Sequence, residues 1–282
     1  MRSPVFPIIT EQVRKLPFYV TGIGCFYDQE HMIRHIGHHD FLWIQSNRGK
    51  GKFIVEGTTY IVNENQGMLL YPSVPHEYYR LTRQWEVDWI TFDGAQIRPF
   101  LRSIGLLKSS ALSLSHPEIV RSTIRQALEA NQQSSAVNAI QSAVYAYQLL
   151  LDLSIYGSIN NESSKMHQYN KLDPVFSYVN QNYSEDLTLQ SLAEKMNLTP
   201  QHLSSIFKKT VGLSLFEYIT MIRIQKSKEL LLIERNRQIK EIADMVGFNS
   251  VSYFCSVFKK HVRMTPNEFR RLYGDTSPPP GA

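Results

Sequence analysis

The chain of 282 residues is long enough for two domains, and its 43% hydrophobic residues suit ordinary globular cores. Its two cysteines, Cys25 and Cys255, exclude a disulfide framework, and no apolar run approaches the roughly 18 residues of a membrane span. The formal net charge is +5, and the excess of positive charge lies in the C-terminal third, where residues 171–273 carry 15 Lys and Arg against 10 Asp and Glu. Binding to an anionic nucleic acid would require such a basic region.

The first half of the chain has the pattern of an antiparallel β domain. After an irregular start that contains Pro4, Pro7 and Pro17, short segments rich in aromatic and β-branched residues alternate with Gly, Asn or Pro turns. Many short strands at this spacing predict an antiparallel barrel or jelly roll. The expected strands are residues 18–26, 40–48, 52–55, 58–62, 68–71, 76–81 and 86–92.

Two helices are expected after the strands, at residues 117–130 and 135–156. Pro117 suits the first position of the former. The latter carries a wide apolar arc, which can cover the β domain and still leave a seam for a partner helix. Simple burial of the whole arc against the β domain is the alternative. The main stripe consists of Val137, Ile140, Val144, Tyr147 and Leu151.

The segment 157–170 is polar and has no hydrophobic periodicity, so it is predicted to be an interdomain linker. A helix is then expected to begin at Asp173-Pro174 and to run through Asn182. The residues 275–282 contain three consecutive prolines and are expected to be disordered. The predicted organisation is therefore a domain at 1–156, a linker at 157–170, a domain at 171–274 and a tail at 275–282.

Residues 187–273 contain an internal repeat of a short helix, a turn and a second helix. Ala193 and Ala243 occupy matching places, and Phe207-Lys208-Lys209 recurs as Phe258-Lys259-Lys260. Both copies contain a helix cap, a turn, a small residue and a basic helix end. This combination is typical of a helix-turn-helix, whose second helix enters the DNA major groove. A helical bundle with a chance repeat is the alternative.

Between the two copies, residues 215–232 contain neither proline nor glycine and are expected to form one helix of about 27 Å at ~1.5 Å per residue. That length is near the roughly 34 Å between successive major grooves on one face of DNA. We expect the paired lysines to contact phosphates and the preceding exposed positions to face bases. The expected DNA-binding residues are Gln201, His202, Ser204, Ser205, Lys208, Lys209, Val251, Ser252, Cys255, Ser256, Lys259 and Lys260.

This C-terminal part resembles the DNA-binding domain of the AraC family of transcriptional regulators. One departure is Arg263, which stands where the family often has a glycine and which would alter a helix C-cap. The resemblance rests on Arg223-Ile224, Ala243, Gly247-Phe248, Tyr253-Phe254, Phe258-Lys259-Lys260 and residues 265–270.

Residues 34–42 and 67–78, with Trp85 and Trp89 after them, resemble the cupin-like ligand domain of the same family. The two resemblances imply an α+β chain of two domains. The N-terminal domain is expected to be a cupin-like antiparallel β-barrel with two helices. The C-terminal domain is expected to be all-α, with two helix-turn-helix motifs joined by a long helix.

Resemblance to the arabinose-binding member of the family implies that Arg34 and Tyr78 contact a sugar and that Trp89 stacks on it. His76 is a further candidate ligand contact. Val87 stands where that member has a ligand histidine, which puts arabinose itself in doubt. Apolar walls with a few directed polar groups are typical of small-ligand sites. The alternative is that Tyr78 and Trp89 are core aromatics and that Arg34 is a solvated loop residue.

Some cupins hold a catalytic metal, so the histidines at positions 35, 38, 39 and 76 raise an enzyme hypothesis. His38 and His39 are adjacent, however, and alternate strand residues point in opposite directions. The chain also lacks a His-x-His sequence. We therefore predict no metal, no cofactor and no catalytic residues.

The resemblance implies a DNA-binding transcriptional regulator, an activator that responds to a sugar or a related small molecule. Its expected partners are a double-stranded DNA operator, the effector, a second copy in a homodimer and, for an activator, RNA polymerase. No secretory signal is visible, so a cytoplasmic protein without membrane contact is expected. The alternatives are a regulator with a non-sugar effector or none, and a cupin enzyme tethered to DNA.

Overall fold

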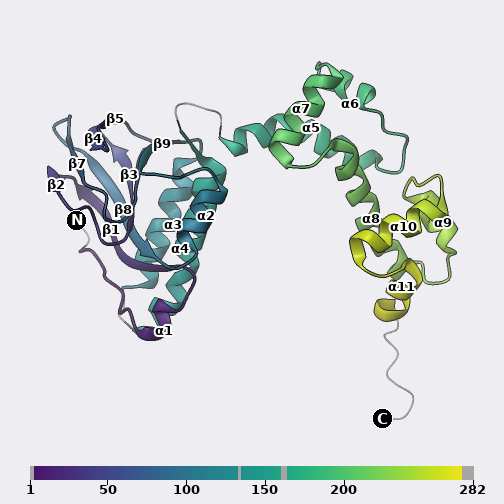
Figure 1. The fold of residues 1–282 in the computed structure, drawn as a ribbon, viewed down its shortest axis with the longest axis horizontal. Coiled ribbons are helices and arrows are strands. Elements are labelled where there is room, and N and C mark those ends of the chain that lie inside the picture. The colour runs from purple at the N-terminus through teal and green to yellow at the C-terminus, as the bar shows by residue number, and fades with distance from the viewer. Residues whose placement is uncertain (1–2, 133–134, 160–163, 275–282) are drawn as a thin grey trace, which may run out of the picture. The chain divides into compact units, whose positions relative to one another are not determined.

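The computed structural model describes residues 3–132, 135–159 and 164–274. Contacts divide the chain into two compact units, one that ends at His167 and one that begins at Gln168 (Figure 1). This boundary falls inside the segment that the sequence predicts to be a linker. The tail predicted at 275–282 lies outside the described residues. Within the described ranges, no helix combines the length and apolarity needed to cross a membrane.

The N-terminal unit contains two antiparallel sheets. One has the strand order β1-β8-β3-β6-β9-β10, and the other has the order β2-β7-β4-β5. Strand pairing among the described residues does not close them into the expected barrel; instead, side chains of both sheets are buried together in one core. The strands are β1 (Tyr19–Asp28), β2 (Met32–Arg34), β3 (Phe41–Arg48), β4 (Gly51–Val55), β5 (Thr58–Val62), β6 (Gln66–Leu70), β7 (His76–Arg80), β8 (Glu86–Asp93), β9 (Ser110–Leu114) and β10 (Gly157–Ser158).

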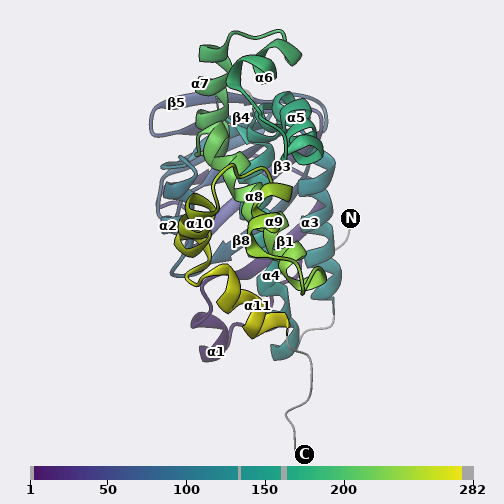
Figure 2. The same ribbon diagram turned by 90° about the vertical axis from the view of Figure 1, so that its right-hand side faces the viewer.

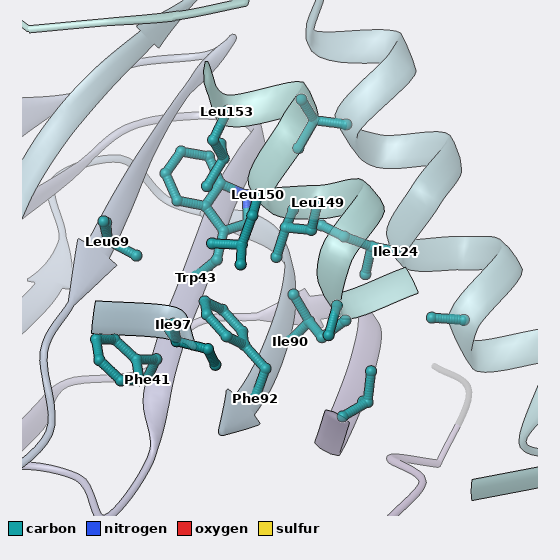
Figure 3. Close-up of a cluster of buried hydrophobic side chains, with 14 of the residues drawn as sticks. Phe41, Trp43, Leu69, Ile90, Phe92, Ile97, Ile124, Leu149, Leu150 and Leu153 are labelled. Carbon is teal, nitrogen blue, oxygen red and sulfur yellow. The ribbon is translucent and has the colours of Figure 1, made fainter. Parts of the chain in front are cut away.

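Helices cover the other face of the larger sheet. The two predicted helices are present as α3 (Pro117–Ala130) and α4 (Ala136–Tyr156), and the Ser135 hydroxyl caps α4. Figure 3 shows Leu149 and Leu150 of α4 beside Trp43 and Ile90 of the larger sheet, in the core between the helices and the sheet. Two short helices that the sequence did not predict are α1 (Glu11–Arg14) and α2 (Ile97–Ser103).

The linker prediction for 157–170 was wrong at both ends. Gly157 and Ser158 pair with β9, and α5 (Lys165–Asn182) begins at Lys165, not at Asp173. Pro174 therefore lies inside this helix. The helix continues past it because the buried side chains of Leu172, Val175 and Val179 face the core of the second unit, and packing of an apolar face outweighs local propensity. Residues 160–163 lie outside the described residues.

The C-terminal unit consists of helices in two small cores. The N-terminal half of α8 contributes Leu215 and Ile219 to the first core, and its C-terminal half contributes Ile224 and Leu231 to the second. Figures 1 and 2 both show α6 and α7 at one end of α8 and the later helices at the other. These helices are α6 (Leu189–Lys195), α7 (Pro200–Val211), α8 (Leu215–Ile233), α9 (Ile239–Met245), α10 (Val251–Val262) and α11 (Pro266–Gly274).

Candidate ligand pocket and DNA-reading helices

A cavity of about 460 Å³ lies in the N-terminal unit, with walls from both sheets and from the segment before α1. Three of the four residues predicted to bind a ligand line it: Arg34 on β2, Tyr78 on β7 and Trp89 on β8. The fourth, His76, does not. The remaining lining residues are Pro4, Phe6, Thr21, Tyr27, Gln29, Met32, His38, His39, Asp40, Leu42, Ile44 and Thr91.

The pairing of β2 with β7 places Arg34 beside the aromatic wall. Met32 pairs with Tyr78 and Arg34 pairs with His76. The Arg34 Nε atom is buried and has no hydrogen-bond partner in the described chain. Burial raises the pKa of Tyr78, and the nearby Arg34 charge opposes this rise. An unpaired buried guanidinium N–H is costly, so a ligand oxygen at this position would stabilise it.

The indole of Trp89 forms a half-buried wall of the cavity. Trp89 pairs with Gly24 of β1, and a Cβ atom on Gly24 would lie 2.4 Å from the indole ring. The rings of Phe6 and Tyr27 each lie 6.2 Å from that of Trp89. Because Gly24 has no side chain, the indole of Trp89 can lie against strand β1. The face of an indole ring is a surface on which a sugar ring can stack.

Polar side chains that the sequence did not single out lie at the same cavity. The Thr21 hydroxyl donates to Asp40 Oδ2 at 2.7 Å and lies 2.8 Å from Thr91 Oγ1. Gln29 also lines the cavity. These residues come from β1, the segment between β1 and β2, the loop before β3, and β8. No sequence spacing could have grouped them, because only the fold of the sheets brings them together.

The histidines near the cavity have structural hydrogen bonds. His76 is only 5% exposed, its Nδ1 lies 2.8 Å from the Val74 carbonyl oxygen, and its ring stacks on Tyr78. His38 Nδ1 accepts from the Asp40 backbone N–H at 3.1 Å. Burial lowers the pKa of both imidazoles, which therefore stay neutral at pH 7. Among the described residues, no group of three or more His, Cys, Asp or Glu side chains is placed to hold a metal ion.

The two helix-turn-helix copies share the same turn geometry. The backbone is left-handed at Asn197 in the first turn, with φ of 53°, and at Gly247 in the second, with φ of 85°. The next residue donates back into the first helix in both copies: Leu198 N–H to Ala193 at 3.0 Å, and Phe248 N–H to Ala243 at 2.9 Å. Both alanines are fully buried, so their small side chains allow the close approach of the two helices.

The second helix of each copy presents the predicted DNA-binding residues on its surface. Thr199 caps α7 and Ser250 caps α10 through their hydroxyl groups. Val251 and Cys255 are half-buried, and burial raises the pKa of the Cys255 thiol. Tyr253, which was not predicted as a contact, is 59% exposed. The exposed members are Gln201, His202, Ser204, Ser205, Lys208, Lys209, Ser252, Ser256, Lys259 and Lys260.

Comparisons with known protein families agree with both halves of this arrangement. A family model described as an AraC-like ligand binding domain matches residues 18–150, which include the cavity. A second model, described as a helix-turn-helix domain, matches residues 192–272, which include α7 and α10.

Individual relatives match over most of the chain. The lactose operon transcription activator of Staphylococcus xylosus is 27% identical over 237 residues, which cover 80% of this chain and 82% of that protein. The raffinose operon transcriptional regulatory protein of Pediococcus pentosaceus is 23% identical over 80% of this chain and 83% of its own. Among solved structures, the C-terminal domain of AraT, a response regulator from Geobacillus stearothermophilus, is 36% identical, covers 38% of this chain and 93% of its own, and has a TM-score of 0.35.

Proposed function

Because this chain belongs to the AraC family of transcriptional regulators, we propose that it activates genes of sugar utilisation when a sugar binds between its two sheets. The cavity beside Trp89 is the observation that carries the proposal. It combines an indole face, a half-buried arginine whose buried Nε–H has no partner among the described residues, and a pair of hydroxyl groups next to a carboxylate. These are the groups that hold the apolar face and the hydroxyl edge of a sugar.

In this proposal Arg34, Tyr78 and Trp89 contact the sugar directly. His76 acts indirectly, because it lies outside the cavity lining and stacks behind Tyr78. Two relatives that match over 80% of this chain are named for the lactose and raffinose operons, which supports a sugar as the effector class. A regulator with a non-sugar effector, or with none, is the second candidate.

For the DNA interface, we propose that α7 and α10 each read one major groove of a double-stranded operator. Lys208, Lys209, Lys259 and Lys260 contact phosphates from the ends of these helices, where all four are exposed. Gln201 and Val251 face bases near the helix starts, as adenine and thymine contacts respectively. We also propose that the protein acts in the cytoplasm, where it would meet its DNA.

For assembly, we propose a homodimer that uses the outer face of α4. Val137, Ile140, Val144 and Tyr147 are all exposed there, although they belong to the apolar stripe of the helix. An exposed apolar stripe at helical spacing suits a partner helix. As an activator, the dimer would recruit RNA polymerase. The family consists of transcriptional regulators, and we assign this chain no enzymatic role.

A thermal-shift screen of the full-length protein against mono-, di- and trisaccharides tests the proposal. A sugar that binds the folded state raises the melting temperature, by an amount that grows with its concentration above Kd. Operator binding in the presence of that sugar then tests its effect on regulation. No shift with any sugar, together with a shift from a non-sugar metabolite, would favour the second candidate. Turnover of the sugar that a chelator abolishes would favour an enzyme.

A further inference from the structure

A second cavity of about 470 Å³ lies in the N-terminal unit, beside α1 and α2. His39 lines both this cavity and the first cavity, beside Arg34, Tyr78 and Trp89, which is called the sugar pocket below. The lining here is mainly polar and basic, whereas the sugar pocket has aromatic walls. The residues that line the second cavity are Arg14, Tyr19, His39, Phe41, Pro72, Asp93, Gly94, Ala95 and Arg98.

The Arg98 guanidinium is held in place by two aromatic rings. Its central carbon lies 5.4 Å from the ring centroid of Phe41 and 5.4 Å from that of Tyr71. Contact with aromatic faces orients a guanidinium and leaves its N–H edge available for acceptors. Arg98 is exposed, and no residue in the described ranges forms a hydrogen bond or an ion pair with it, so its donors remain available.

Arg14, at the end of α1, lines the same cavity and also has no ion pair or side-chain hydrogen bond within the described part of the chain. The one carboxylate in the lining, Asp93, already has partners. It accepts from the Tyr19 hydroxyl at 3.1 Å and from the Gly94 N–H at 2.8 Å. Burial and Asp93 raise the pKa of Tyr19 to about 12, so this phenol keeps its proton and remains a donor.

We propose that this cavity is a phosphate-binding site, separate from the sugar pocket, in which Arg98 and Arg14 bind the oxygens of one phosphate group. Two guanidinium groups and one engaged carboxylate line the cavity, which leaves a net positive charge for a tetrahedral oxyanion. The planar N–H fork of arginine matches two oxygens of such a group. The phosphate is either inorganic phosphate or the phosphate end of a small metabolite, and it acts as a second input to the sensor domain.

Calorimetric titration of inorganic phosphate into the full-length protein at low ionic strength tests this site. We expect saturable binding that Arg98→Gln and Arg14→Gln each weaken by about tenfold or more, the loss for one charge-assisted hydrogen bond. Arg83→Gln is the matched control, because Arg83 is exposed, carries the same charge and lies outside the cavity. It should bind phosphate as the unchanged protein does.

Arg98→Gln also removes the contacts with Phe41 and Tyr71, so its melting temperature is measured without phosphate. Arg14→Gln removes no such contact and gives an independent measurement. A parallel titration with glucose 6-phosphate separates the two sources. Tighter binding than inorganic phosphate, again lost in Arg98→Gln, indicates a phosphorylated metabolite, and equal binding indicates free phosphate. No saturable binding of either probe, or equal binding by all three variants, would overturn the proposal.

Discussion

Gly212 and Arg263 end α7 and α10 in the same left-handed conformation, with φ of 80° and 66°. Each donates its backbone N–H to the carbonyl oxygen of the lysine four residues earlier, which is Lys208 at 3.0 Å for Gly212 and Lys259 at 2.9 Å for Arg263. Glycine adopts this conformation without strain, whereas the Cβ atom of an arginine introduces a strain that costs about 1 kcal/mol of folding free energy. Arg263 thus forms the same type of left-handed helix C-cap as Gly212, although it carries a side chain.

We therefore expect Arg263→Gly to raise the free energy of unfolding of the C-terminal unit by up to about 1 kcal/mol. Urea denaturation followed by circular dichroism measures the change. Gly212→Ala is the matched control, and it should destabilise by a similar amount because it places a Cβ atom in the same conformation. A less stable Arg263→Gly protein would mean that the arginine side chain makes a contact that outweighs the strain.

Gly24→Ala should disrupt the sugar pocket, because the new methyl group would meet the Trp89 indole at 2.4 Å. The indole must then move, and we expect the effector to bind at least about tenfold more weakly, since a shifted ring loses its stacking contact. Calorimetry with the effector found in the thermal-shift screen measures this. At Gly57 a Cβ atom would meet nothing within 4 Å. Gly57 has a left-handed φ of 74°, so Gly57→Ala adds a methyl group and some backbone strain outside the pocket. It therefore controls for a general loss of stability and should leave effector affinity unchanged.

The sequence predicted most long elements because their signals are local. Pro117 and Ser135 mark the starts of α3 and α4, and the repeat fixed both helix-turn-helix copies. β2 and β9 were missed because each is short and has no strong alternation, so pairing with β7 and β6 defines them. In the pocket, the motif resemblance found Arg34 and Trp89. Thr21 and Thr91 were missed, because nothing in a single strand signals a hydrogen bond to another.

Arg34→Ala should abolish the response to the effector and leave basal DNA binding intact. The guanidinium lines the cavity, and one of its N–H groups is buried without a partner. Loss of a hydrogen bond from a charged donor costs roughly 1.5–3 kcal/mol, or about ten- to hundredfold in affinity. Calorimetry on the full-length protein gives the affinity, with Arg80→Ala as a control because Arg80 is exposed and pairs with Asp28. Equal effector affinity in Arg34→Ala would place the site elsewhere.

Stability should fall as the pH drops below about 6.5. Burial, with the nearby charges of Arg34 and His38, lowers the pKa of His76 below its ordinary value of 6.5, and burial also lowers that of His38. A lowered folded-state pKa means that the unfolded chain takes up protons first. This contribution to stability is therefore present above pH 6.5 and is lost as the pH falls through the folded pKa.

The free energy of unfolding at pH 7, 6 and 5 measures this effect. His76→Asn should flatten the dependence, because asparagine does not titrate and its amide can replace the Nδ1–H donor to Val74. His167→Asn is the control, since His167 is an exposed histidine that lines neither cavity of the N-terminal unit. An unaltered pH dependence in His76→Asn would assign the effect to other groups.

The salt dependence of operator binding tests the phosphate contacts. Lys259 and Lys260 are exposed in the last turn of α10, as Lys208 and Lys209 are in α7. A lysine that neutralises one phosphate releases condensed counterions, so its replacement by alanine should lower the slope of log affinity against log salt by about 0.9. Because such a contact reads no base, operator and random DNA should weaken alike. Lys108→Ala, an exposed change in the N-terminal unit, should leave the slope unaltered. The contrary outcome is that each of the four single lysine-to-alanine variants keeps the salt slope of the unchanged protein. In that case the ends of α7 and α10 would not lie on the DNA backbone. The two helices would then have to enter the grooves in another orientation.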